Sequence, residues 1–178
     1  SIIIRRAARS MPAKQSLIAE ISVIIPAYRS AKTIGRALTS IAGQTVRPRE
    51  VIVVDDGSDD GTAEVARSFA DRINGAKLMV IEQENHGAGA ARNRGLEAAS
   101  EKWVAFLDAD DEWVPEKLER SLDVMAETGA VLVSHDFIRV EDGKMQKIDC
   151  ARHFKNHRAP FIALYLRGNI ATSTVLVE

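Results

Sequence analysis

Apolar and polar positions along the chain form two alternating patterns. Short apolar runs rich in β-branched residues are typical of buried strands, and they lie at residues 21–25, 51–54, 77–81, 103–107 and 130–133. Between these runs, apolar residues recur at helical spacing, as in Ile34, Leu38 and Ile41 and again over residues 65–73 and 118–125. Connections between parallel strands of one sheet are almost always right-handed crossovers. We therefore predict an α/β fold with a mostly parallel sheet and helices on both faces.

Turn and capping residues support these boundaries. Residues 60–62 (Asp-Gly-Thr) precede the second helical segment and Gly75 closes it, while Pro115 and Glu116 open the helical segment over residues 118–125. The pattern weakens after residue 137. There we predict only a helix over residues 160–166 and a strand over residues 172–177.

Length and composition indicate one domain. The 178 residues suffice for one domain with its own core, and we assign residues 21–178 to it and residues 1–20 to an N-terminal extension. The apolar run at residues 2–4 is too short for an export signal or a membrane span. We expect the extension to pack outside the domain, with contact to a membrane surface as the alternative.

Charge and cysteine content narrow the partners and the compartment. The 24 basic and 25 acidic side chains nearly cancel, so no net field recruits nucleic acid. The one cysteine, Cys150, has no partner for an internal disulfide, which favours a reducing, cytoplasmic location.

Four polar clusters follow the predicted strands directly. They comprise Pro26, Ala27 and Tyr28; Asp55, Asp56, Gly57 and Ser58; Asn85, His86 and Gly87; and Asp108, Ala109, Asp110 and Asp111. In open parallel sheets, ligands bind in the crevice outside the carboxyl ends of the strands. We therefore expect the four clusters to share one site.

The fourth cluster suggests a metal ion. In an extended chain, Asp108 and Asp110 point the same way, and two adjacent carboxylates persist best with a cation between them. Mg²⁺ or Mn²⁺ held by one or two carboxylates keeps positions open for phosphate oxygens. The alternative is that Asp110 and Asp111 are helix-start acids before Pro115.

The second cluster is not a calcium loop. An EF-hand loop beginning at Asp56 has its required glycine at Gly61, but its twelfth position is Arg67 and not glutamate. A buried carboxylate at this strand end is instead suited to accept hydrogen bonds from a pyrimidine imide or a ribose.

The third cluster allows a dinucleotide-binding turn, since Gly87 and Gly89 follow a strand and Asp108 lies about 20 residues on. However, Arg92 occupies the third glycine position, where it would crowd the packing of helix on strand. We favour a helix start whose small residues let a phosphate approach, with Arg92 pairing a phosphate or an acid. A purely structural ion pair of Arg92 is the equally open alternative. Neither a zinc site nor a nucleophile elbow is present in the sequence.

Taken together and in order, four segments resemble family 2 glycosyltransferases: residues 23–28 (VIIPAY), 53–62 (VVDDGSDDGT), 85–87 (NHG) with 91–95 (ARNRG), and 106–111 (FLDADD). The resemblance covers about residues 21–125. One departure is Arg29, where the family usually has asparagine, and this alters the first loop without removing the site.

The resemblance implies a GT-A fold and an enzyme that transfers a sugar from a nucleotide-activated donor, UDP-sugar above all, with inversion. It also implies a saccharide or lipid-linked acceptor and a Mn²⁺ or Mg²⁺ cofactor. Pro26 and Tyr28 would then border the base, Asp56 would contact the pyrimidine, Asp108 the ribose and Asp110 the metal ion. The implied donor site comprises Pro26, Ala27, Tyr28, Asp55, Asp56, Asn85, Gly87, Arg92, Asp108 and Ala109.

The family also uses a later Asp or Glu as general base, and we find no such segment before Glu178. We therefore expect the base and the acceptor-binding part to lie beyond this chain, which would then bind donor but transfer sugar poorly. The family suggests surface polysaccharide synthesis at the inner face of a membrane. The alternatives are a metal-dependent nucleotidyltransferase and a non-catalytic donor-binding module.

Overall fold

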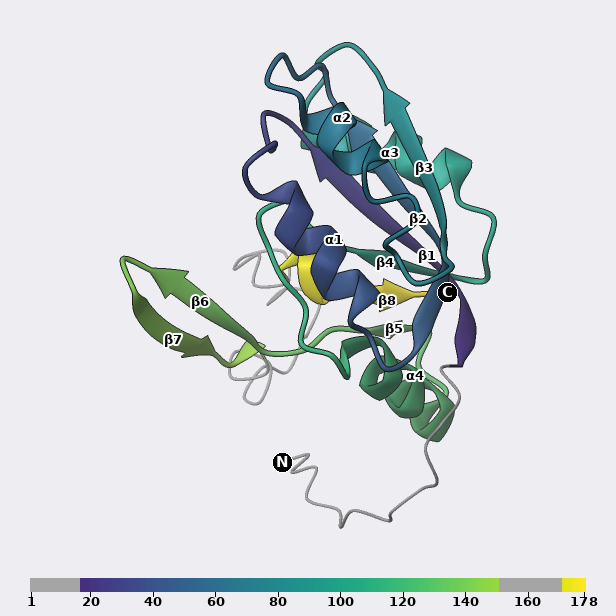
Figure 1. The fold of residues 1–178 in the computed structure, drawn as a ribbon. Coiled ribbons are helices and arrows are strands. Elements are labelled where there is room, and N and C mark those ends of the chain that lie inside the picture. Colours follow the sequence, from purple (N-terminus) through teal and green to yellow (C-terminus); the bar gives the residue numbers. More distant parts are fainter. Residues whose placement is uncertain (1–16, 151–170) are drawn as a thin grey trace.

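A computed structural model describes residues 17–150 and 171–178. The strands are β1 (Ile18–Ala27), β2 (Arg47–Asp55), β3 (Lys77–Glu82), β4 (Trp103–Phe106), β5 (Leu132–Val133), β6 (Phe137–Glu141), β7 (Lys144–Ile148) and β8 (Leu176–Val177). The helices are α1 (Ile34–Ala42), α2 (Thr62–Arg67), α3 (Ala88–Ala98), α4 (Lys117–Thr128) and the short 3-10 helix η2 (Thr172–Thr174). Figure 1 shows their arrangement.

The main sheet is six-stranded, in the order β3-β2-β1-β4-β8-β5. The pairs β1–β2, β1–β4 and β2–β3 are parallel, so the loops after these four strands emerge at one edge of the sheet. Strand β8 runs antiparallel to both β4 and β5. The prediction of a mostly parallel α/β sheet is therefore confirmed, with one reversed strand that the sequence pattern did not indicate.

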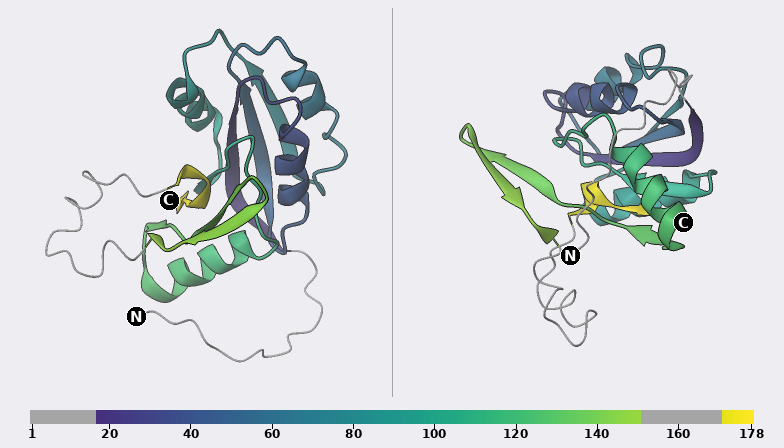
Figure 2. Two further views of the ribbon diagram at one scale, coloured as in Figure 1. Left: turned by 90° about the vertical axis from the view of Figure 1, so that its left-hand side faces the viewer. Right: turned by 90° about the horizontal axis from the view of Figure 1, so that it is seen from below.

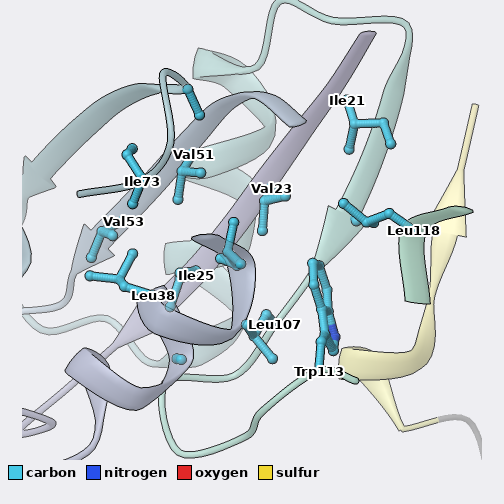
Figure 3. Close-up of a cluster of buried hydrophobic side chains, with 14 of the residues drawn as sticks. Ile21, Val23, Ile25, Leu38, Val51, Val53, Ile73, Leu107, Trp113 and Leu118 are labelled. Atoms are coloured by element: carbon cyan, nitrogen blue, oxygen red, sulfur yellow. The ribbon is translucent and has the colours of Figure 1, made fainter. Parts of the chain in front are cut away.

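Helices cover both faces of the sheet, as predicted (Figure 2). Alternate residues of β1 point to opposite faces. Ile21, Val23 and Ile25 join the larger core, into which α1, α2 and α4 pack (Figure 3). Ile24 points the other way, toward Gly95 of α3. Each strand near the site is thus fixed from two sides.

Three predicted elements differ in extent. Of the strand expected over residues 130–133, only Leu132–Val133 form β5. Helix α2 begins at Thr62, as expected, because the Asp60 carboxylate accepts hydrogen bonds from the backbone and hydroxyl of Thr62. It ends at Arg67, although the later apolar positions Phe69 and Ile73 are still buried, within turns. The strand expected over residues 172–177 is the helix η2 followed by the two-residue strand β8.

A hairpin of β6 and β7 projects from the sheet (Figure 1) and was not predicted. Its turn has positive φ at Asp142 and Gly143, and an Asp-Gly pair is a strong hairpin signal. Strand β1 begins at Ile18, inside the range assigned to the N-terminal extension. Residues 1–16 and the helix expected over residues 160–166 lie outside the described residues.

Candidate functional site

The loops after β1 and β2 are joined by backbone contacts. The amide of Asp56 donates to the carbonyl of Ala27 (2.8 Å), and the amide of Arg29 donates to the Ser58 hydroxyl (2.9 Å). Pro26 lies at the end of β1, paired in register with Val54 of β2. The first two predicted clusters therefore lie side by side at the edge of the sheet.

Asp55 shapes the turn after β2. Its buried carboxylate accepts hydrogen bonds from the amide and the hydroxyl of Ser58. Gly57 has φ +76°, and a Cβ atom there would lie 3.0 Å from the Asn85 amide nitrogen. Only glycine meets both conditions without strain, so this turn and the Asn85 loop pack together closely.

Asp56 holds the loop after β3. Its side chain is buried, and its carboxylate accepts hydrogen bonds from Gln83 Nε2 (2.7 Å) and from the amides of His86 (3.0 Å) and Gly87 (2.7 Å). Burial alone would raise the pKa of Asp56, but these hydrogen bonds outweigh it and the pKa is lowered. Asp56 is therefore a stable anion that joins the second and third clusters.

The first loop is braced by Arg29, the position that departs from the family pattern. Arg29 has φ +49°, a conformation that asparagine tolerates better than arginine. Its guanidinium forms a two-bond ion pair with the exposed Asp59 and lies 5.3 Å from the ring centroid of Tyr28. Tyr28 is 47% exposed at the edge of the sheet. The departure changes how this loop is held and leaves Tyr28 accessible.

The fourth cluster is a turn and not an extended segment. The Asp111 amide donates to the Asp108 carbonyl (3.0 Å), so our assumption of extended geometry, with Asp108 and Asp110 pointing alike, was wrong. Strand β4 ends at Phe106, so the residues that follow it can form a turn. Ala109 is buried beneath the turn, while Asp110 is exposed.

Arg92 of α3 joins the third and fourth clusters. Its Nη2 atom lies 2.6 Å from Asp108 Oδ1, and the two side chains are 25% and 34% exposed. Arg92 Nε is buried without a partner in the described part of the chain. The structure thus contains an ion pair of Arg92 with an acid, which both interpretations of Arg92 allow.

The carboxylates near the turn can hold a metal ion only if a bound molecule supplies the other coordinating atoms. No group of three His, Cys, Asp or Glu side chains within residues 17–150 and 171–178 is arranged to hold one. Burial and the nearby charges of Asp110 and Asp108 raise the pKa of Asp111, against a hydrogen bond from Ser173. This crowding of negative charge favours a cation. The oxygen donors suit Mg²⁺ or Mn²⁺ that is shared with a diphosphate and do not suit a complete protein cage.

A separate groove lies beside α1. It has a volume of about 560 Å³ and is lined by residues of α1 and its two flanks together with Phe69, Glu112, Trp113 and Pro115. None of the predicted site residues lines this groove. The candidate site is therefore the open edge where the four loops meet.

A family model described as Glycosyl transferase family 2 matches residues 22–175, which include all four clusters. This chain belongs to that family. Solved structures that are similar to this chain confirm the predicted GT-A fold.

Two family 2 relatives illustrate the sequence similarity. The chain is 40% identical over 132 residues to the glycosyltransferase alr2836 of Nostoc sp., covering 74% of this chain and 40% of that protein. It is 38% identical over 123 residues to the putative teichuronic acid biosynthesis glycosyltransferase TuaG of Bacillus subtilis, covering 65% of this chain and 48% of TuaG. The chain thus spans less than half the length of these relatives.

Two solved structures share the fold. S. aureus TarS 1-349 in complex with UDP superposes with a TM-score of 0.69 at 27% identity, covering 88% of this chain and 46% of that one. The mannosyltransferase PcManGT of Pyrobaculum calidifontis, in complex with GDP-Man and Mn²⁺, superposes with a TM-score of 0.61 at 25% identity, covering 76% of this chain and 46% of that one.

Over the described residues, no helix has the length and apolarity needed to cross a membrane.

Within this family 2 site the structure adds Gln83 and Ser173, which the sequence pattern did not single out, and it gives Gly95 a role. Gln83 binds Asp56, Ser173 binds the Asp108–Asp111 turn, and Gly95 lets α3 approach β1, because a Cβ there would lie 2.4 Å from Ile24 Cγ2. Gly95 belongs to the ARNRG segment, which the sequence pattern singled out as a whole. Gln83 and Ser173 have no local signal, since their partners lie 27 to 65 positions away.

Proposed function

We propose that this chain forms the donor-binding part of an enzyme that transfers a sugar from a nucleotide-activated donor to a hydroxyl acceptor with inversion. The observation that carries the proposal is the linkage of four loops at one sheet edge. Asp56 ties the loops after β2 and β3, and Arg92 ties α3 to the loop after β4. Family 2 membership supports sugar transfer as the reaction.

The base and ribose of the donor are assigned to the first two loops and to Asp108. Tyr28 is exposed and suited to border a base together with Pro26. A carboxylate has about four lone-pair positions, and the Asp56 carboxylate uses three of them within the chain. The remaining position suits one hydrogen bond from a pyrimidine imide, while Asp108 would accept from a ribose beside its bond to Arg92.

The diphosphate is assigned to the turn at Asp108–Asp111. Asp110 is exposed and makes no hydrogen bond or ion pair with any residue in the described ranges, so its carboxylate is available to hold a divalent ion. The ion, when bound, neutralises the negative charge that develops on the leaving diphosphate. The guanidinium of Arg92, which pairs with Asp108, places a second positive group beside the same turn.

Relatives support the proposed donor and pathway. TarS has been solved with UDP and with UDP-GlcNAc, and PcManGT with GDP-Man and Mn²⁺. TuaG is named for teichuronic acid biosynthesis and AmsB of Erwinia amylovora for amylovoran biosynthesis. We infer a UDP-sugar donor, Mn²⁺ or Mg²⁺ and a saccharide or lipid-linked acceptor in surface polysaccharide synthesis. The general base beyond Glu178 and a cytoplasmic, membrane-facing location stay predictions.

Calorimetric titration of UDP, GDP and TDP into the chain, each with and without Mn²⁺, tests the proposal. We expect UDP to bind most tightly and to gain about tenfold in affinity with Mn²⁺, as one added charge contact would give. Equal heats for the three nucleotides with no effect of Mn²⁺ would contradict it.

A further inference from the structure

Ser173 contacts the proposed metal-binding turn from a segment more than 60 residues away in sequence. It lies in η2, at the end of the described chain, and is 7% exposed. We propose that Ser173 is a positioning residue that holds the Asp108–Asp111 turn in the shape that presents Asp110 to a divalent ion and diphosphate. This inference rests on the proposed function and adds a residue to its site.

The Ser173 hydroxyl acts on both ends of the turn. It accepts a hydrogen bond from the amide of Asp108 (3.0 Å) and donates one to Asp111 Oδ2 (2.6 Å). A hydroxyl has one donor and two acceptor positions, so both contacts form at once. Asp110 lies between the two contacted residues and is itself exposed. The hydroxyl therefore holds the backbone before Asp110 and the side chain of the residue after it, without occupying the Asp110 carboxylate.

Backbone groups of the same segment extend this support. Trp113 Nε1 donates to the Ser173 carbonyl (2.8 Å), and Lys117 Nζ lies 3.3 Å from the Val175 carbonyl. In Figure 3 the Trp113 indole faces η2 with its nitrogen toward the yellow ribbon. Before the turn, Ala105 and Val104 of β4 pair with Leu176 and Val177 of β8. The chain is thus held against residues 173–177 both before and after the turn.

Such support matters most for a site with few protein ligands. A metal ion that takes one or two carboxylates from the protein and the rest of its ligands from a diphosphate binds well only if those carboxylates are already placed. Ordering a loop on binding would consume part of the binding free energy. Removing the hydroxyl should therefore weaken the metal-dependent part of nucleotide binding selectively.

The test compares Ser173→Ala, Ser173→Thr and a matched control, Thr174→Val. Thr174 also lies in η2 and is also buried, but among the described residues its hydroxyl bonds only to the nearby Ala171 carbonyl. UDP is titrated into each chain with and without Mn²⁺, and thermal unfolding is followed in parallel. We expect Ser173→Ala to lose about tenfold of the Mn²⁺-dependent affinity, as loss of a hydrogen bond to a charged group implies. Its metal-free UDP affinity should be unchanged.

Thr174→Val and the hydroxyl-retaining Ser173→Thr should keep the Mn²⁺-dependent gain. A general loss of structure would instead weaken UDP binding with and without the metal. If Ser173→Ala does not fold, Ser173→Cys fills the same space with a weak donor and should show the same selective loss. Full Mn²⁺-dependent affinity in Ser173→Ala or Ser173→Cys overturns this inference alone. No Mn²⁺-dependent gain in the unsubstituted chain overturns the proposed function and this inference with it.

Discussion

Lys117 is a buried cation beneath the proposed metal-binding turn. The residue is 2% exposed, and its ammonium lies 3.3 Å from the Val175 carbonyl and 4.1 Å from the ring centroid of Trp113. Burial lowers the pKa of Lys117 to about 7. His135 lies near enough that the Lys117 charge adds to the effect of burial in lowering the pKa of His135. The ammonium thus exchanges water for a carbonyl and an aromatic face, at a cost to stability.

The unfolding free energy should therefore rise with pH. Between a folded pKa of about 7 and the ordinary value of 10.5, the unfolded chain binds one more proton than the folded chain. The slope should approach about 1.4 kcal/mol per pH unit in that window and vanish below it. Lys117→Met keeps the apolar stem and should lack this contribution, as urea unfolding from about pH 6 to about pH 9 would reveal. Parallel pH profiles for the two proteins would refute the assignment.

For single residues, the sequence predicts the acidic residues and the arginine of the candidate site better than it predicts the groups that bind them. Asp56 and Asp108 were recognisable because acidic residues are concentrated at two of the predicted strand ends, and Arg92 because it lies in the helix start that follows another. Their hydrogen bonds to His86, Gly87 and one another depend on how neighbouring strands place the loops. Ser173 gave no signal at all, because a serine in a short polar segment is ordinary until the fold brings it to Asp108.

Among the elements, α3 shows how helix packing sets the position of a site residue. A Cβ on Gly95 would lie 2.4 Å from Cγ2 of the fully buried Ile24, so α3 lies against β1 as closely as glycine allows. Arg92 is one turn earlier on the same helix and reaches Asp108 from there. Moving α3 away from the sheet would therefore disturb this ion pair as well as the core.

Two glycine substitutions in α3 test this close packing. Gly95→Ala should lower the unfolding free energy by about 1–3 kcal/mol, because overpacking outweighs the gain in helix propensity. Gly89→Ala is the matched control, since no atom lies within 4 Å of a Cβ there, and it should raise stability by about 0.5–1 kcal/mol. Chemical denaturation measures both. Equal shifts for the two variants would show that α3 does not pack as described.

The order and type of the helices and strands follow from the apolar periodicity of the sequence, but their lengths and the strand directions do not. The four parallel strands and the helices α1 and α4 match their predicted positions, because their apolar spacing agrees with their burial. Helix α2 is shorter than its apolar spacing suggests, since Phe69 and Ile73 are buried from turns. The antiparallel insertion of β8 depends on pairing with β4 and β5, which a two-residue strand cannot indicate by itself.

In the whole molecule, the parallel sheet brings residues that are far apart in the sequence close together. The loops after β1, β2, β3 and β4 emerge from parallel neighbours, and hydrogen bonds then join these loops and helix α3 to one another. The reversed strand β8 brings Ser173 to the same edge. Family 2 relatives extend well beyond this region. The chain spans 40% of the length of one relative and 48% of the other. The donor side of the reaction is therefore where this chain can be tested.

The most direct measurement is calorimetric titration of UDP, with and without Mn²⁺, into the unsubstituted chain, Asp110→Asn and Asp123→Asn. Asp123 is an exposed acid on α4 and provides the same change of charge away from the turn. We predict that Asp110→Asn loses the Mn²⁺-dependent gain of about tenfold and keeps metal-free UDP binding, while Asp123→Asn behaves like the unsubstituted chain. Retention of the full gain in Asp110→Asn would contradict the account.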